Sequence, residues 1–200
     1  MNIKAIVLFS AAIVGTINYV TCPEVVVEKL ILPHITSTPP PEEYVAESAR
    51  IPRTVPVIDS VTQADVECLT KNIYFEAKNQ SLAGQLAVGI VTLNRVAHSR
   101  WPNTVCGVVK QARVWNGHPI RNQCQFSWYC DGKPDVFRNK DAHIQARQLA
   151  EALLDPEAAF VDFTEGADHY HADYILPPSW TSMMVQVTQV DNHIFYVRTL

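Results

Sequence analysis

The sequence predicts a mainly helical α+β domain that ends in a β-hairpin, and three features of the chain support this fold class. Apolar residues recur at helical spacing over residues 63–77, and they cover nearly every side of residues 81–98. Residues 185–197 are rich in β-branched and aromatic side chains and are interrupted by Asp191-Asn192-His193, as in two strands joined by a turn. Helices followed by strands, without regular alternation, are typical of α+β domains.

The first helix is expected to begin after Thr62, which can cap it. Its apolar stripe consists of Val66, Leu69, Ile73 and Ala77. Helical spacing places Glu76 at the edge of this stripe rather than on the solvent face. A carboxyl group beside an apolar surface is partly desolvated, which raises its pKa toward the range that a general acid needs. The alternative is a surface glutamate that pairs with Lys71 or Lys78.

The second helix, over residues 81–98, is apolar on nearly all sides and is therefore expected at the centre of the domain. Arg95 is its only formal charge. Asn94 is a polar residue in the same helix, and it is either a core amide or a group that orients Glu76 or the substrate. The other expected elements are a short third helix from Asn103, a loop over residues 116–135 and a fourth helix over residues 140–154.

The N-terminal part of the chain differs in composition from the rest. Lys4 is the only charged side chain before Glu24, and the apolar run between them predicts a signal peptide or signal anchor at residues 1–21. The run is short for a membrane span, which needs about 20 apolar residues, and a buried core helix is the alternative. Residues 22–57 contain seven prolines and are expected to form an extended linker. Residues 58–200 then form the folded domain.

Charge and cysteine content narrow the class of protein further. The net charge of −4 shows no excess of positive charge, so electrostatics does not support nucleic-acid binding. Cys68, Cys106, Cys124 and Cys130 lie in the folded domain, and an even number after an export signal suggests at least one disulfide, with three possible connectivities. Their spacing does not match a zinc site. Four reduced thiols are the alternative.

Several short motifs occur in order along residues 62–199. They are Ile73-Tyr74-Phe75-Glu76-Ala77, Gly84-Gln85-Leu86-Ala87-Val88, Leu93-Asn94-Arg95-Val96, Trp101-Pro102-Asn103-Thr104-Val105-Cys106-Gly107-Val108-Val109, Cys124-Gln125-Phe126-Ser127-Trp128, and Ala167-Asp168-His169-Tyr170-His171-Ala172 with Pro178-Ser179-Trp180. Together they resemble the spore cortex-lytic cell-wall hydrolase family (SleB/CwlJ-like).

The resemblance implies a lysozyme-like fold related to lytic transglycosylases. It also implies cleavage of peptidoglycan glycan strands between N-acetylmuramic acid and N-acetylglucosamine, with residues 58–200 as the catalytic domain and Glu76 at the position of the family's catalytic glutamate. One departure is Lys78-Asn79-Gln80-Ser81, where many relatives have an acidic or glycine-containing turn. Another is the membrane-type N-terminus, so a bacterial envelope enzyme and a phage lysis enzyme (an endolysin) fit equally well.

A single acid favours a lytic transglycosylase, in which Glu76 protonates the glycosidic oxygen and then accepts the proton of the muramic acid's own C6 hydroxyl, giving a 1,6-anhydro product. A hydrolytic muramidase is the first alternative, and it would use Asp131, Asp168 or Asp173 as a second carboxylate, although each also fits a turn or cap. A non-catalytic wall-binding protein is the second alternative.

The candidate substrate-binding residues are Asn94, Gln125, Ser127, Trp128, Tyr170 and His171. Aromatic rings stack on the apolar faces of sugars, and amides and hydroxyls bind their polar edges. Phe126 and Trp128 can equally be buried loop anchors. Histidines at 169 and 171 with Asp173 are weak evidence for a metal site, because no third firm ligand stands out, so neither a catalytic metal nor a cofactor is expected. We expect an exported monomer of the periplasm or cell envelope, bound to glycan strands and to the membrane through its N-terminal segment.

Overall fold

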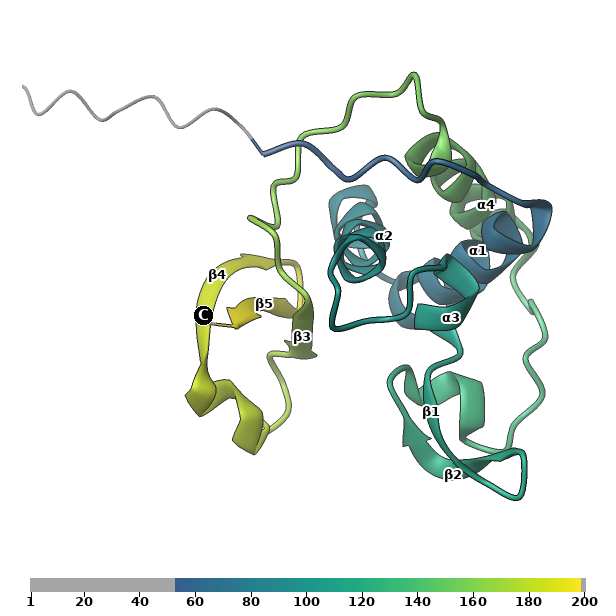
Figure 1. Cartoon of the computed structure of the whole chain (residues 1–200), viewed down its shortest axis with the longest axis vertical. Helices are drawn as coiled ribbons and strands as arrows, with labels where there is room; N and C mark the ends of the chain where they lie inside the picture. The colour runs from purple at the N-terminus through teal and green to yellow at the C-terminus, as the bar shows by residue number, and fades with distance from the viewer. Residues whose placement is uncertain (1–52, 199–200) are drawn as a thin grey trace, which may run out of the picture. The chain divides into compact units, whose positions relative to one another are not determined.

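The computed structural model describes residues 53–198 of the 200-residue chain (Figure 1). The predicted signal or anchor at 1–21 and nearly all of the linker at 22–57 lie outside the described residues. Within the described part of the chain, no helix is long and apolar enough to span a membrane. The described residues form four α-helices and two small antiparallel sheets, which confirms the mainly helical α+β class.

Helix α1, Gln63–Ala77, begins where the sequence predicts. The Thr62 hydroxyl accepts a hydrogen bond from the Asp65 backbone amide at 3.2 Å, and the Asp65 carboxylate accepts one from the Thr62 amide at 3.2 Å. This reciprocal pair satisfies two of the backbone donors that a helix N-terminus leaves free. Leu69 and Ile73 of the predicted stripe are fully buried.

Helix α2, Leu82–Ala97, is the central element, with Ser81 as its N-cap. In Figure 1 it lies between the three-stranded sheet and the other helices. One side packs in the large core with α1, α3 and α4, and the other side packs Ala87 and Val91 against Phe195 of the sheet. A helix that is apolar all round needs such neighbours on both sides.

Two further helices complete the large core. Helix α3, Val105–Val109, is capped by Thr104 and begins two residues after the expected start at Asn103. Helix α4, Lys140–Leu154, has the predicted bounds and is capped by Asn139, whose side chain accepts from the Ala142 amide at 3.0 Å.

The prediction of a loop over residues 116–135 is wrong in its first half. Strands β1, Ala112–Trp115, and β2, His118–Cys124, form an antiparallel hairpin there, and the short 3₁₀ helix η1, Ser127–Cys130, follows. Asn116 and Gly117 both have positive φ, 48° and 78°. An Asn-Gly pair with this geometry is the preferred two-residue hairpin turn, so the signal was present in the sequence.

The predicted C-terminal hairpin is confirmed as β4, Met184–Val190, and β5, His193–Arg198. A third strand, β3, His169–Ala172, pairs antiparallel with β5 and gives the order β3-β5-β4. The 3₁₀ helix η2, Ser179–Met183, leads into β4. The strand β3 lies in a motif that the sequence marked as functional, and its place in the sheet fixes Tyr170.

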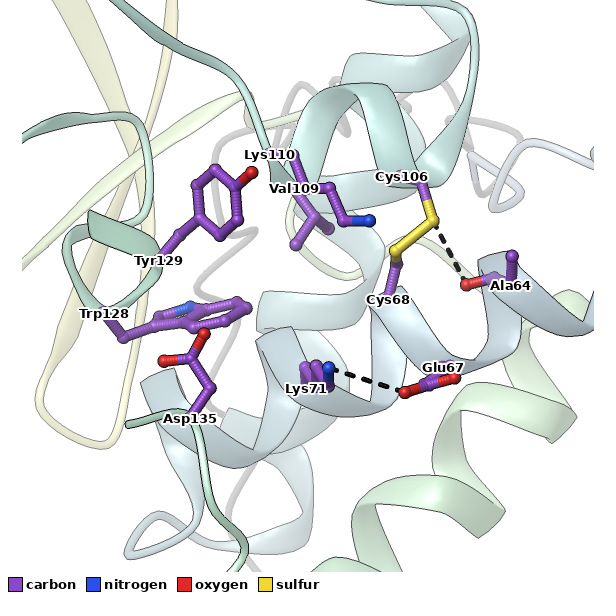
Figure 2. Close-up of a pocket in the computed structure, with 10 residues that line it drawn as sticks. All are labelled: Ala64, Glu67, Cys68, Lys71, Cys106, Val109, Lys110, Trp128, Tyr129 and Asp135. Carbon is purple, nitrogen blue, oxygen red and sulfur yellow. Dashed lines mark hydrogen bonds and ion pairs between the residues drawn. A yellow bond between two sulfur atoms is a disulfide. The ribbon is translucent and has the colours of Figure 1, made fainter. Parts of the chain in front are cut away.

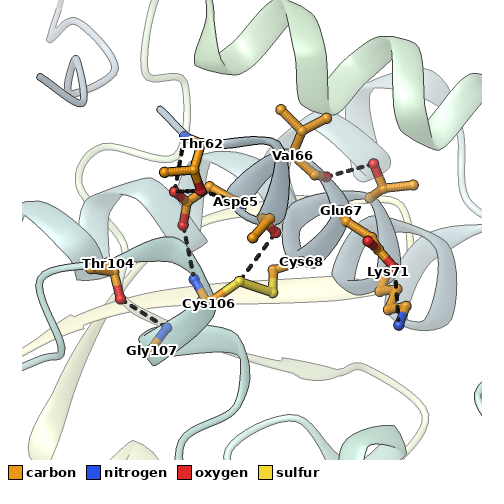
Figure 3. Close-up of a disulfide and its surroundings, with 11 residues drawn as sticks. Thr62, Asp65, Val66, Glu67, Cys68, Lys71, Thr104, Cys106 and Gly107 are labelled. Atoms are coloured by element: carbon orange, nitrogen blue, oxygen red, sulfur yellow. Dashed lines mark hydrogen bonds and ion pairs between the residues drawn. A yellow bond between two sulfur atoms is a disulfide. The ribbon is translucent and has the colours of Figure 1, made fainter. Parts of the chain in front are cut away.

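Two disulfides form, which confirms the expectation of at least one and shows which of the three possible connectivities is present. Cys68 of α1 is joined to Cys106 of α3, with Cα atoms 5.3 Å apart (Figure 3). Next to this bond, the Asp65 carboxylate also accepts a hydrogen bond from the Cys106 amide at 3.4 Å. The second bond, Cys124–Cys130, closes the segment between β2 and the end of η1.

Candidate active site

Glu76 lies in the last turn of α1, and its partly exposed side chain lines a pocket. The other lining residues come from α2, from the segment after β2 and from β3; they are Arg95, Gln125, Phe126, Ser127 and Tyr170. We call this the acid pocket. It joins residues from four separate parts of the sequence around one carboxyl group.

The environment of Glu76 favours the protonated acid. The Tyr170 hydroxyl donates a hydrogen bond to Glu76 Oε2 at 3.1 Å. Burial raises the pKa of Glu76 above its ordinary value, and the Tyr170 hydrogen bond and the positive charge of Arg95 offset part of this rise. The same two groups stabilise the carboxylate that forms once the proton has left. The pocket can therefore support both forms of the acid.

Arg95 is buried beside this acid and is contacted on several sides. Its Nε donates to the Asp168 carbonyl at 2.7 Å, and its guanidinium carbon lies 4.4 Å from the centre of the Trp101 ring. The Phe126 ring lies on another side, at 5.1 Å. A buried cation with several such contacts acts as a fixed charge in a medium of low dielectric.

Gln125 and Ser127 belong to the acid pocket, as the sequence predicts for groove residues, and both are exposed. The Gln125 backbone amide donates to the Gln111 carbonyl at 2.9 Å, which fixes the segment to the end of α3. Phe126 between them is buried, whereas its two neighbours are exposed. Their amide and hydroxyl groups are placed to bind a polar ligand.

Three other predicted substrate contacts lie outside the acid pocket. Trp128 is buried, donates from Nε1 to Asn72 Oδ1 at 3.1 Å and stacks on Phe75, so it has the loop-anchor role considered from the sequence. Asn94 is a core amide that donates to Asp162 Oδ2 and to the Ala167 carbonyl, both at 3.1 Å. His171 is buried between the Ala172 carbonyl and the Tyr196 hydroxyl.

The three aspartates considered as a second carboxylate also lie elsewhere. Asp168 is buried in contact with Arg100 and His169, Asp131 pairs with Lys133, and Asp173 accepts a hydrogen bond from Gln189. Among the described residues, Glu76 is the only acidic residue that lines the acid pocket. Residues 53–198 also contain no group of three or more His, Cys, Asp or Glu side chains arranged to hold a metal.

Sequence reasoning missed Arg95 and Phe126 as lining residues of the acid pocket. A signal existed for Arg95, because it is the only formal charge in a helix that is otherwise apolar on all sides. A cation at such a position must be compensated by neighbours, and a buried site is where this occurs. Nothing in the sequence distinguished Phe126 from any other buried aromatic residue.

The comparisons with known proteins assign the chain to a known family. Residues 79–196, more than half of the chain, match the family model described as Cell Wall Hydrolase. The chain therefore belongs to the cell wall hydrolase family, which confirms the resemblance. The match begins three residues after Glu76, so the assignment of the acid rests on the geometry of the pocket.

Particular relatives carry the name spore cortex-lytic enzyme. One from Bacillus cereus is 27% identical over 139 residues, covering 70% of this chain and 46% of the relative. One from Oceanobacillus iheyensis is 28% identical over 142 residues, covering 71% and 45%. The chain thus spans about half the length of these curated relatives.

Solved structures show the same fold. The catalytic domain of the Bacillus cereus SleB protein has a TM-score of 0.52 and 25% identity, covering 70% of this chain and 95% of that domain. The catalytic domain of SleB from Bacillus anthracis has a TM-score of 0.53 and 24% identity, covering 70% of this chain and 100% of that domain. These neighbours confirm the predicted lysozyme-like class.

Proposed function

We propose that this protein cleaves the glycan strands of peptidoglycan between N-acetylmuramic acid and N-acetylglucosamine, with Glu76 as the general acid. The observation that carries the proposal is a single, partly desolvated carboxyl group in a pocket that is otherwise lined by neutral polar, aromatic and cationic side chains. Membership in the cell wall hydrolase family and the names of the spore cortex-lytic relatives support the choice of polymer. The place of action is then outside the cytoplasmic membrane, in the periplasm or envelope.

The chemical steps follow from one acid. Protonated Glu76 gives its proton to the glycosidic oxygen while the bond from that oxygen to C1 of the muramic acid breaks and positive charge develops on the ring. Tyr170 and Arg95 stabilise the Glu76 carboxylate left behind. That carboxylate then removes the proton of the C6 hydroxyl, whose oxygen bonds to C1. The 1,6-anhydro ring closes, the acid is restored and no water is consumed.

Hydrolysis by a muramidase is the second candidate. A hydrolase of this kind ordinarily uses a second carboxylate as nucleophile or as base for water. The absence of another acid among the described residues of the acid pocket favours the transglycosylase. A non-catalytic wall-binding protein would need no group with a raised pKa, so the environment of Glu76 also argues against that alternative.

The deciding experiment is digestion of purified sacculi followed by mass analysis of the released fragments. A transglycosylase gives anhydro products that are one water lighter than the products of hydrolysis. Glu76→Gln should abolish release while the chain remains folded and still binds sacculi. Glu151→Gln is the matched control, because this exposed residue of α4 pairs with Arg147 and does not line the acid pocket. Release by Glu76→Gln at the normal rate would show that the acid is wrongly assigned.

A further inference from the structure

A second hollow adjoins the acid pocket. Ser127 lines both, and Phe75, the residue before Glu76 in α1, lines the second one together with Trp128. We call it the side hollow. Its volume is about 440 Å³, within the range of about 300–1,000 Å³ that is common for ligand sites. Trp128 and Asp135 separate it from the pocket drawn in Figure 2, since both residues line the two cavities.

The rim of the side hollow carries cationic side chains that the protein leaves available. Lys78, Lys133 and Arg138 line it and are exposed. Lys133 lies 3.5 Å from the Asp131 carboxylate. Within residues 53–198, Lys78 and Arg138 form no ion pair. Lys78 lies over the Tyr74 ring at 4.9 Å, a contact that leaves its N–H groups free to donate.

The same rim carries two carboxylates. Asp131 and Asp135 both line the side hollow. Burial and the nearby charge of Asp131 raise the pKa of Asp135, although Lys71 opposes this. A cation bound beside Asp135 would oppose this rise of its pKa. The hollow therefore presents donors for anions and acceptors for an amine above a floor of Phe75 and Trp128, which are half-buried and buried.

We propose that the side hollow is a subsite for the peptide stem that is attached to the lactyl group of the muramic acid. This inference rests on the proposed function, because it assumes that the muramic acid occupies the acid pocket. The lactyl group is on C3 of the ring whose C1 is cleaved, so the stem begins beside the reacting bond. Ser127 is the residue that the sugar and the first part of the stem would share.

The chemistry of a stem peptide matches the rim. Such peptides carry several carboxylates, and a free amine where the diamino acid is not cross-linked, with small alanine side chains between them. Lys78 and Arg138 are placed for the carboxylates and the two aspartates for the amine. The preferred substrate is then ordinary peptide-bearing glycan rather than strands from which the peptides have been removed.

Binding tests this directly. The full chain with Glu76→Gln is titrated with the disaccharide N-acetylglucosaminyl-N-acetylmuramic acid, with or without its tetrapeptide. We expect tighter binding of the peptide-bearing ligand, and the additional change Lys78→Ala with Arg138→Ala should weaken that binding about tenfold, or about 1.4 kcal/mol. Binding of the bare disaccharide should stay within a factor of about two, since about 0.4 kcal/mol is small on this scale. Salt should weaken the preference, because exposed charges are screened.

The matched control removes two cations that do not line the hollow. Lys140→Ala with Arg147→Ala changes the net charge equally on exposed positions of α4 and should leave both affinities unchanged. Equal affinity of the parent for the two ligands, or equal loss for both ligands in the Lys78 and Arg138 variant, overturns the inference.

A cleavage assay distinguishes failure of the stem subsite from failure of the proposed function. Selective binding of the peptide-bearing ligand without any release from sacculi would keep the stem subsite and reject the proposed reaction. Cleavage of peptide-free strands as fast as peptide-bearing ones, with insensitivity of both to the loss of Lys78 and Arg138, would keep the reaction and reject the subsite.

Discussion

The two disulfides are expected to affect different properties, one mainly the free energy of unfolding and the other mainly kcat/KM. Cys68–Cys106 closes 38 positions of sequence and joins two core helices, whereas Cys124–Cys130 closes 6 and lies beside the acid pocket. The entropy lost by the unfolded chain on cross-linking gives about 3.9 kcal/mol for the long loop and about 2.2 kcal/mol for the short one. Cys68→Ala with Cys106→Ala should therefore be the more destabilising pair.

The short loop should matter more for cleavage. Cys124–Cys130 brackets Gln125 and Ser127, the two neutral polar side chains of the acid pocket. Without the bond, these groups must be ordered when the substrate binds, which weakens transition-state binding. We expect Cys124→Ala with Cys130→Ala to lower kcat/KM about tenfold, which corresponds to about 1.4 kcal/mol. The long-loop variant should retain near-normal kcat/KM at temperatures where it is folded.

Two measurements decide this comparison. Urea unfolding of the parent and both double variants gives the free energies of unfolding, and initial rates on a soluble glycan substrate give kcat/KM. A greater loss of stability for the short loop would refute the entropic argument. Unchanged kcat/KM for the short-loop variant would refute the ordering role of the bond.

Three further predictions follow from single hydrogen bonds and charges. Tyr170→Phe removes the donor to Glu76, which raises the pKa of that acid further, so the fall of kcat/KM at alkaline pH should move to higher pH in a pH–rate profile. Burial raises the pKa of Glu76 above 4.5 in the folded state, so the ionised acid lowers the free energy of unfolding increasingly as the pH rises from 4.5 through the folded pKa. Glu76→Gln should therefore be more stable than the parent at neutral pH and equally stable at low pH, which urea unfolding at the two pH values measures. Thr62→Ala removes the cap of α1 and should cost about 1 kcal/mol of unfolding free energy without changing kcat/KM.

The helices could be predicted because their signals are local. Caps such as Thr62, Ser81 and Asn139, together with the spacing of apolar residues, fix where a helix begins and which side it buries. The sequence predicts a loop in place of the hairpin β1–β2 because its glycines and prolines are typical of loops, although Asn116-Gly117 is also a hairpin turn. Strand β3 has only four residues, and its pairing with β5 depends on residues more than twenty positions away.

The site was predictable only in part for a similar reason. Gln125, Ser127 and Tyr170 lie in motifs of the family and do line the pocket of Glu76. Motif membership does not distinguish them from Trp128 or from the buried His171, because one motif contains both lining and supporting residues. The distinction depends on which side of a short segment faces the pocket, and tertiary contacts alone determine that.

The turn between β4 and β5 is anchored on the chain segment just after Glu76. The Asp191 carboxylate accepts a hydrogen bond from the Ser81 amide at 2.8 Å, and the Asn192 amide donates to the Gln80 side chain at 3.4 Å. Strand β5 in turn forms the middle of the sheet and holds Tyr170 of β3.

The pocket can therefore be completed only when residues 193–198 have been synthesised and paired. A ribosome-bound chain that lacks them would have no assembled acid pocket. Fusions or truncations near Arg198 should disturb activity before they disturb folding of the helices.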